Sequence, residues 1–528
     1  MPPADPSAAL RRHFYLILGS VTVFLAAAKI VGSENVVEPS RYAPATEANF
    51  GFDRAGKPER KWPATRPEPT PMFGSNDRSR WATVRSLVDE GTYVVGKRES
   101  GKPDVGIIFE DGYQSLDKVI IPETGEFYSS KPPLLTTILA GEYWLLKHGF
   151  GWSIVRDRWL VVCTILLTVN GLPFAVYLLL LAKLIDRYGT TDFGKLLTFT
   201  TACLGTFLTT FASTLNNHSP AAYCVVFALY PLLRSGGAES RRDLLIAGFF
   251  AGLVPTMDLP AAAFSVALLI PLLYVRPKAT LVFFVPAMLI PIAALFACNY
   301  AALGRFLPAY SDFGGPMYEF AGSHWQKLKL VKQGFPQKGI DFADEPKSVY
   351  AFHLLLGHHG WFSLTPVFAA SLLGIAILIR RSIPSVRRVL IRKVPSTEAV
   401  FNLPIAGAMT AVVSLVVMIY FVFKTNNYGG FTSGPRWFFW MIPLWLIAGL
   451  PGVDRIARTR SGRCSLAILL GFSAFAVFFP AWNPWRPPWI LQALERLESV
   501  NYDVVQRESG ASDGNTRFDL SDLAAFGR

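Results

Sequence analysis

Residues 158–183 read RWLVVCTILLTVNGLPFAVYLLLLAK, and this stretch decides the fold class. Charged residues stand only at its two ends. A helix of roughly 20 apolar residues crosses the hydrocarbon core of a bilayer, which is about 30 Å thick. Helices suit this task because they satisfy their own backbone hydrogen bonds within lipid. The stretch therefore predicts a transmembrane helix.

About ten further apolar runs have the composition expected of such helices. They lie near 13–32, 194–213, 219–234, 243–257, 259–275, 279–301, 361–380, 402–423, 435–451 and 464–480. Of the 528 residues, 51% are hydrophobic and 17% are charged, whereas a soluble domain usually has about 25% charged residues. The sequence predicts an all-α polytopic membrane protein with about 11 transmembrane helices.

The basic residues predict the orientation of the chain. If the N-terminus is cytoplasmic, the inner loops are 184–193, 234–243, 276–278, 380–393 and 454–463, and most are rich in Lys and Arg. Cytoplasmic loops carry this excess. We therefore expect a multi-pass protein of the bacterial inner (plasma) membrane. The net charge of +13 is spread along one face, which favours contact with the lipid bilayer and argues against a nucleic-acid partner.

The same alternation places large polar segments outside. We expect a transmembrane domain over 1–480, with outer loops at 33–157 and 302–360, followed by an outer tail at 481–528. Within the first loop, Trp81, Val84, Leu87 and Val88 recur with helical spacing, which predicts an amphipathic helix on the membrane surface.

Two more elements are expected in the first outer loop. Residues 92–130 hold short β-prone runs separated by turn pairs, which predicts a small β-hairpin insert. Residues 132–151 begin with two prolines and are too short to span a bilayer cleanly, so they predict an interfacial helix.

Titratable residues are concentrated on the predicted outer face. Six of the seven histidines lie there, namely His148, His218, His324, His353, His358 and His359. Such a concentration favours a functional site on that face. The alternative is that large polar loops simply hold more of every polar residue.

Two residues of the first loop have a specific chemical argument. Asp77 stands where a predicted helix begins, so it is either a helix cap or a functional carboxylate. Lys131 precedes two prolines at the start of the next helix, where a cation opposes the helix dipole. Both the dipole and the lysine favour a bound anion such as phosphate at that position.

Three further positions have two interpretations each. Asn217 and His218 lie at an outer turn, where such residues are ordinary turn and cap formers or bind a ligand. Asp258 lies between two apolar runs, where an acid is either functional or a cap. Two adjacent histidines, as at His358 and His359, cannot share one helical face, so we expect no obligatory metal.

Several segments resemble one family. The motif DRSRWA, residues 77–82, resembles the Asp-Glu-x-Arg-Tyr-Ala motif in the first outer loop of GT-C class glycosyltransferases, in the branch of the lipid A aminoarabinose transferases and protein O-mannosyltransferases. FYSSKPPL, residues 127–134, resembles the Tyr-Phe-x-Lys-Pro-Pro-Leu segment of that branch. Residues 427–430 and 433–437 resemble an outer-loop segment of related bacterial members.

The chain departs from the family pattern at two points. Arg78 occupies the second acidic position of the motif, and residues 34–76 separate the motif from the first helix. Glu34 or Glu38 could therefore compete for the catalytic role. We prefer Asp77, because the residues that follow it keep the register of the motif.

The resemblance implies a GT-C fold and an inverting glycosyltransferase with its active site on the periplasmic face. The donor would be a sugar on a polyprenyl phosphate, and the acceptor a lipid, a glycan or a protein. Asp77 would be the catalytic base, and Lys131, Arg80 and Arg436 would bind the donor phosphate. The possible substrate-binding residues are Trp81, Tyr128, Asn217, His218, Asp258, His358 and Tyr428. No cofactor is implied, although some members use a divalent metal.

Two other functions remain open at this stage. A transporter or flippase often contains inverted repeats, and this sequence has no internal repeat that we can detect. A catalytically inactive relative that serves envelope polysaccharide assembly is the other alternative, since the substitution at Arg78 departs from the motif and fold alone does not define function.

Overall fold

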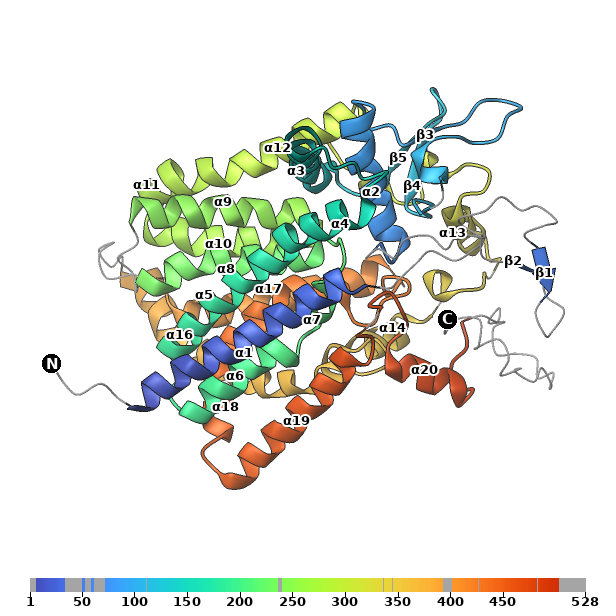
Figure 1. The fold of residues 1–528 in the computed structure, drawn as a ribbon. Coiled ribbons are helices and arrows are strands. Elements are labelled where there is room, and N and C mark those ends of the chain that lie inside the picture. Colours follow the sequence, from blue (N-terminus) through green and yellow to red (C-terminus); the bar gives the residue numbers. More distant parts are fainter. Residues whose placement is uncertain are drawn as a thin grey trace.

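A computed structural model of the chain describes residues 6–33, 50–52, 58–60, 72–110, 112–235, 240–335, 337–343, 345–392, 401–425, 427–481 and 483–502. These residues are mostly helical, and the longer helices lie side by side in a bundle (Figure 1). Glu34 and Glu38, named above as rivals for the catalytic role, lie outside the described residues.

Seven segments among the described residues are long and apolar enough to cross a membrane. The helices that form them are α1 (Pro6–Val31), α4 and α5 (Arg158–Leu166 and Leu172–Tyr188), α11 and α12 (Pro277–Ala279 and Val285–Leu303), α16 (Ala369–Arg392), α17 (Leu403–Lys424), α18 (Ile442–Ile456) and α19 (Arg460–Phe478). The composition of these helices agrees with the predicted helical membrane protein, whereas the expected count of about 11 spans is not confirmed.

The remaining apolar runs form helices outside these seven segments. They are α6 (Asp192–Leu204), α7 (Phe207–Phe211), α8 (His218–Ser235), α9 (Arg241–Met257) and α10 (Ala262–Val275). The helix is interrupted between α6 and α7, so the run at 194–213 is not one continuous helix. Helix α8 packs against α5 and α9 and is almost entirely buried. Its apolar residues therefore pack against other helices in the core of the protein.

Small residues bring α9 and α12 close together. A Cβ atom on Gly248 would lie 2.2 Å from the carbonyl oxygen of Phe284, and one on Gly252 would lie 2.1 Å from that of Met288. Only glycine fits at these two positions. Spacing of small residues by four along a helix is a common basis of close helix packing in membranes.

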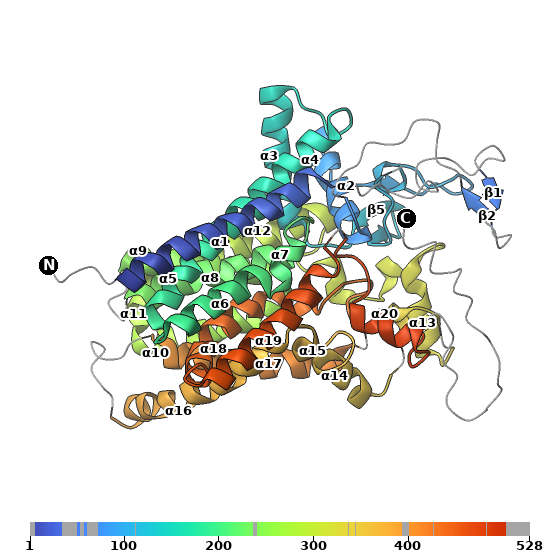
Figure 2. The ribbon, with the colours of Figure 1, turned by 60° about the horizontal axis from the view of Figure 1, so that its bottom comes forward.

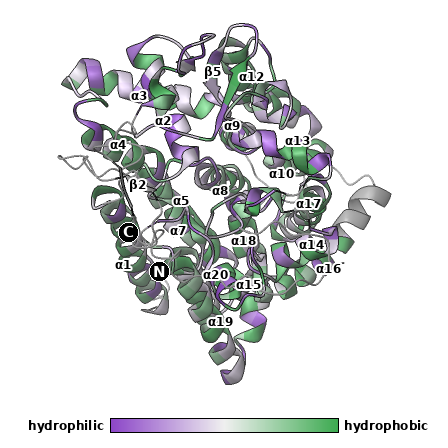
Figure 3. Cartoon of the chain, turned by 90° about the vertical axis from the view of Figure 1, so that its right-hand side faces the viewer, coloured by the Kyte–Doolittle hydropathy of each residue, from purple (hydrophilic) through white to green (hydrophobic). Residues whose placement is uncertain are grey.

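The other elements gather at the end of the bundle opposite the N-terminus (Figures 1 and 2). The helices there are α2 (Ser75–Asp89), α3 (Pro133–Phe150), α13 (Lys327–Lys332), α14 (Lys347–Leu355), α15 (Trp361–Leu364) and α20 (Trp489–Arg496). The strands are β1 (Phe50–Phe52), β2 (Pro58–Arg60), β3 (Gly96–Lys97), β4 (Lys118–Ile121) and β5 (Glu126–Ser129). Figure 3 looks onto this end and shows hydrophilic stretches in α2 and α3 and near α13, with more hydrophobic helices such as α19 around them.

The predicted hairpin insert is confirmed. Strands β4 and β5 pair antiparallel, with Val119 opposite Tyr128, and a turn at Thr124 and Gly125 joins them. Strand β3 pairs with the other edge of β5, which gives the order β3-β5-β4. The helix expected at 132–151 is also present, as α3.

The placement of α2 differs from the prediction. We expected this helix on the membrane surface, but Asn76 through Val84 are all buried, which leaves no polar face in solvent over the first two turns. The apolar spacing that suggests a surface helix is real, since Trp81 and Val84 are core residues. The polar residues between them are buried too, because the insert and the starts of other helices supply hydrogen-bonding partners.

Candidate active site

Asp77 lies in the first turn of α2 and is completely buried. One carboxylate oxygen accepts a hydrogen bond from the backbone N–H of Gly74 at 3.3 Å, and the other accepts one from the indole Nε1–H of Trp485 at 3.2 Å. Burial raises the pKa of Asp77 to about 7, although Trp485 and the charge of Arg80 act to lower it. The residue therefore both caps its own helix and presents a carboxyl group that exchanges a proton near neutral pH.

Arg80 lies one turn further along α2 and is also buried. Its guanidinium donates to the backbone oxygen of Asn76 at 3.1 Å and to the side-chain oxygen of the same residue. The other terminal nitrogen donates to Oδ1 of Asn217 at 2.6 Å. Burial lowers the pKa of Arg80 to about 10, against the opposing effect of Asp77. The guanidinium remains charged at neutral pH and ties α2 to the start of α8.

Lys131 forms an ion pair that the sequence did not indicate. Its Nζ lies 2.6 Å from Oδ1 of Asp117, a residue just before β4. Burial lowers the pKa of Lys131, Asp117 opposes this, and the positive charges of Arg80 and Arg436 add to the lowering. Burial would raise the pKa of Asp117, but the cations, chiefly Lys131, hold it below its usual value. One carboxylate thus neutralises part of a larger positive cluster.

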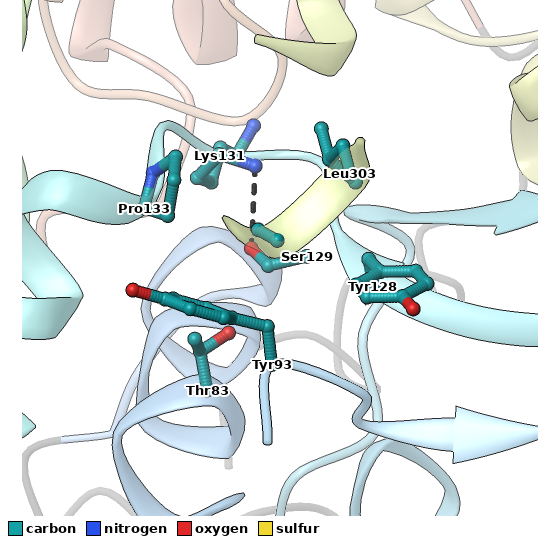
Figure 4. A pocket seen from close by; sticks show the side chains of 8 residues that line it. Thr83, Tyr93, Tyr128, Ser129, Lys131, Pro133 and Leu303 are labelled. Carbon is teal, nitrogen blue, oxygen red and sulfur yellow. Dashed lines mark hydrogen bonds between the residues drawn. The ribbon is translucent and has the colours of Figure 1, made fainter. Parts of the chain in front are cut away.

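A small cavity lies beside Lys131 (Figure 4). Tyr93, Tyr128 and Leu303 line it, and the backbone N–H of Lys131 donates to the hydroxyl of Ser129 at 3.2 Å. Tyr128, expected as a possible substrate-binding residue, donates its own hydroxyl to Glu126 at 2.9 Å. The cavity lies between the Lys131 segment and the end of α12 and has room for about one water molecule.

Arg436 stands at the start of the 3₁₀ turn Arg436–Met441 that leads into α18. Its Nε and Nη1 are buried and have no hydrogen-bond partner among the described residues. The guanidinium lies 4.9 Å from the ring centroid of Trp485. It interacts electrostatically with Asp117 and, more weakly, with Asp77. A buried guanidinium with two such nitrogens is well suited to receive an anion.

His218 and Asp258 form a second pair close to these cations. Nδ1 of His218 lies 2.7 Å from a carboxylate oxygen of Asp258, and both residues are buried. Arg436 and Arg80 both act electrostatically on His218. Next to this pair, the Asn217 amide donates to the backbone oxygen of Met257 at 2.8 Å. The turn before α8 and the end of α9 therefore adjoin the cation cluster.

Three other predicted residues, Tyr428, His358 and Trp81, make their contacts outside this cluster. The nearest polar contacts of Tyr428 and His358 are with Glu345, His359 and Tyr502. The ring of Trp81 is fully buried among apolar residues, so its observed role is packing. The structure thus brings together Asp77, Arg80, Lys131, Arg436, Asn217, His218 and Asp258, and sequence analysis missed Asp117 and Trp485.

Arg78 replaces the acidic residue of the family motif and has a structural role. Its Nε donates to the backbone oxygen of Gln114 at 2.7 Å, and its Nη1 donates to that of Phe73 at 3.0 Å. Both bonds join α2 to the segments that flank it. The side chain therefore positions the helix that carries Asp77.

We expect Arg78→Ala to destabilise this region by about 2–4 kcal/mol, because hydrogen bonds from a charged donor contribute about 1.5–3 kcal/mol each. Thermal unfolding of the purified protein measures the effect as a lower midpoint. Lys97→Ala, which removes an exposed charge from β3, is the matched control and leaves the midpoint unchanged. Equal midpoints for the two variants would contradict the role given to Arg78.

The sequence matches no protein-family model, and no curated protein matches it. The functional argument therefore rests on the chemistry and the placement of the residues. Chemically, the site combines a carboxyl group that titrates near neutral pH with three basic side chains in a largely buried setting. Such a site can accept a proton from a neutral nucleophile while it stabilises negative charge on a nearby group.

Proposed function

We propose that the protein is an inverting glycosyltransferase of the GT-C type, which moves a sugar from a polyprenyl-phosphate donor to a lipid, glycan or protein acceptor. The proposal places the protein in the bacterial inner membrane, with its N-terminus in the cytoplasm and this site on the periplasmic face. The polar end of the bundle would then lie opposite the cytoplasmic N-terminus.

One observation carries the proposal. Asp77 interacts electrostatically with Arg80 and Arg436, and these two cations act in turn on Lys131. Within the described part of the chain, Lys131 is the one of these three cations that forms a direct ion pair, with Asp117. A site next to apolar helices, with a buried Arg436 guanidinium whose Nε and Nη1 have no partner among the described residues, suits a lipid-linked phosphate.

The proposed reaction is a single displacement. Asp77 accepts the proton of the acceptor hydroxyl as the acceptor oxygen forms its bond to the anomeric carbon. The bond between that carbon and the phosphate oxygen breaks, and the electron pair leaves with the polyprenyl phosphate. Arg436 and Lys131 stabilise the charge that develops on the departing phosphate. Arginine grips phosphate through two hydrogen bonds, while lysine acts as a point charge.

The decisive experiment is transfer of radiolabelled sugar from polyprenyl-phosphate donors in membranes that contain the protein. We expect transfer by the wild-type protein to endogenous acceptor, with inversion at the anomeric carbon. Transport assays with the same donors in vesicles provide the contrast. Movement of the intact donor across the bilayer without cleavage of the sugar–phosphate bond would contradict the proposal.

The pKa of Asp77 sets a pH dependence. Because the base is the ionised carboxylate and its pKa is about 7, kcat/KM should rise with pH through about 7 and level off above it. Trp485→Phe removes the hydrogen bond that lowers this pKa, so its rising limb should move to higher pH. Trp489→Phe, a nearby indole without a contact to Asp77, is the control. If kcat/KM rises over the same pH range in the wild type, Trp485→Phe and Trp489→Phe, that result would contradict the assignment of Asp77 as the base.

A further inference from the structure

A second polar cluster lies between the outer loops and the C-terminal segment. Glu345 and His353 come from the region of α14, and His358 follows the end of that helix. Tyr428 belongs to the loop after α17, and Tyr502 follows α20. The cluster is distinct in its contacts from the Asp77 site and was not predicted as a unit.

Most of its polar atoms form one hydrogen-bonded chain. The hydroxyls of Tyr428 and Tyr502 donate to the two carboxylate oxygens of Glu345, the second at 2.7 Å. Since the Tyr502 proton is used in this way, its oxygen accepts from Nε2–H of His358 at 2.8 Å. Nδ1 of His358 then accepts from Nδ1–H of His359 at 2.6 Å. The geometry thereby fixes the tautomer of both histidines.

His353 takes no part in these hydrogen bonds. Its Nδ1 is buried and has no hydrogen-bond partner among the described residues. Its ring stacks on that of His358, with centroids 4.0 Å apart and planes 22° apart. An unpaired buried nitrogen costs about 1–3 kcal/mol, so this arrangement calls for a ligand that the imidazole can bind.

We propose that Glu345, His353 and His358 bind a divalent transition-metal ion, with Zn²⁺ as the best match. One ligand atom from each residue lies within 4.8 Å of the other two. Two imidazoles and one carboxylate are a common zinc ligand set, and three protein ligands leave a fourth position for water. Two ligands on one tetrahedral zinc lie about 3.4 Å apart. Side-chain rotation must therefore close the cluster and tilt the two rings apart, since a metal lies in the plane of each imidazole.

The surrounding residues provide the outer shell that such a site needs. When Nε2 of His358 binds the metal, its proton would move to Nδ1 and donate to Nδ1 of His359, whose own proton would move to its Nε2. Tyr428 continues to donate to the Glu345 carboxylate. Histidine and carboxylate ligands in metal sites are usually held by hydrogen bonds of this kind, which orient the ligands and raise their basicity.

The expectation of no obligatory metal came from the adjacent pair His358 and His359, which cannot share a helical face. In the structure, the second imidazole comes from His353, and the turn after α14 brings it onto His358. His359 instead forms the hydrogen bond that would orient His358 as a ligand.

The metal site would fasten together the segments that complete the Asp77 site. Tyr428 lies in the loop that leads from α17 to Arg436. The backbone N–H of Gly339 donates to the backbone oxygen of Tyr502 at 2.6 Å. Tyr502 and Trp485, the partner of Asp77, lie in the same C-terminal part of the chain. The ion would therefore have a structural role, and its binding does not depend on the proposed transferase function.

Metal analysis of the purified full-length protein tests the proposal. The protein is stripped with chelator, loaded with ZnSO₄ and freed of excess metal by dialysis. We expect about one zinc ion per wild-type chain, and a chelator-dependent fall in the thermal midpoint. With Co²⁺ in place of zinc, visible absorption bands of four- or five-coordinate cobalt should appear.

His353→Phe is the critical variant, because phenylalanine can keep the ring stack but offers no ligand nitrogen. We expect this variant and Glu345→Gln to lose the zinc, the cobalt bands and the effect of chelator on the midpoint. His324→Gln, which alters an outer-loop histidine bonded to Asp341, is the control and retains all three. Wild-type protein without bound zinc, or zinc retained by His353→Phe at the wild-type level, would overturn the proposal.

Discussion

Asp77→Asn should lower sugar transfer by about a hundredfold to ten-thousandfold, the range typical of a lost general base. The amide cannot accept a proton from the acceptor hydroxyl at any useful pH. It keeps the size of the carboxyl group and can still accept one of the two hydrogen bonds that come from Gly74 and Trp485. Because burial raises the pKa of the carboxyl group to about 7, its neutral replacement should leave the protein folded.

The matched control is Asp89→Asn, the same change on the same helix. Asp89 accepts from Lys147 at 2.8 Å and from the hydroxyl of Tyr143 at 3.0 Å, and it has no contact with the cation cluster. Radiolabel transfer in membranes, normalised to folded protein, compares the two. Near wild-type transfer by Asp77→Asn would remove Asp77 as the base, and His218, Glu34 and Glu38 would then be tested by the same assay.

Lys131→Met should reduce transfer by about a hundredfold to a thousandfold, the usual effect of removing one preorganised group that stabilises charge in the transition state. The change also leaves the carboxylate of Asp117 without its nearest cation. Removal of one partner from a buried pair is destabilising, so loss of activity in this variant alone has two explanations.

The double variant Lys131→Met with Asp117→Asn distinguishes these two explanations for the loss of activity. It removes both charges of the pair and avoids the isolated carboxylate. If Lys131 binds the phosphate, the double variant should regain stability but stay inactive. Thermal midpoints and transfer rates of the wild type, both single variants and the double variant complete the cycle. Recovery of wild-type transfer in the double variant would show that Lys131 serves only to neutralise Asp117.

Local patterns in the sequence were sufficient for much of this structure. Runs such as 158–183 predicted helices because apolar length is a property of one segment. The hairpin at β4 and β5 followed from turn residues and alternation, and α3 followed from its prolines and apolar run. The motif residues Asp77, Arg80 and Lys131 were chosen from short segments, and the structure brings them together.

Partners from distant segments could not be predicted in this way. Asp117 lies in an insert whose sequence indicated only strands, and nothing local marks it as the partner of Lys131. Trp485 lies in a Trp-rich segment that is equally typical of an interfacial aromatic belt. The helix α2 was placed wrongly for the same reason, since the polar partners that allow its burial come from other parts of the chain.

The bond between Trp485 and Asp77 joins residues 408 positions apart, and this separation has a consequence for biosynthesis. At about 5–20 residues per second, a ribosome adds Trp485 roughly 20–80 s after Asp77. The nascent chain therefore inserts nearly all of its apolar helices before this indole reaches its carboxylate. A protein cut short by a premature stop or by proteolysis ahead of this segment would keep its membrane helices but lack a finished site.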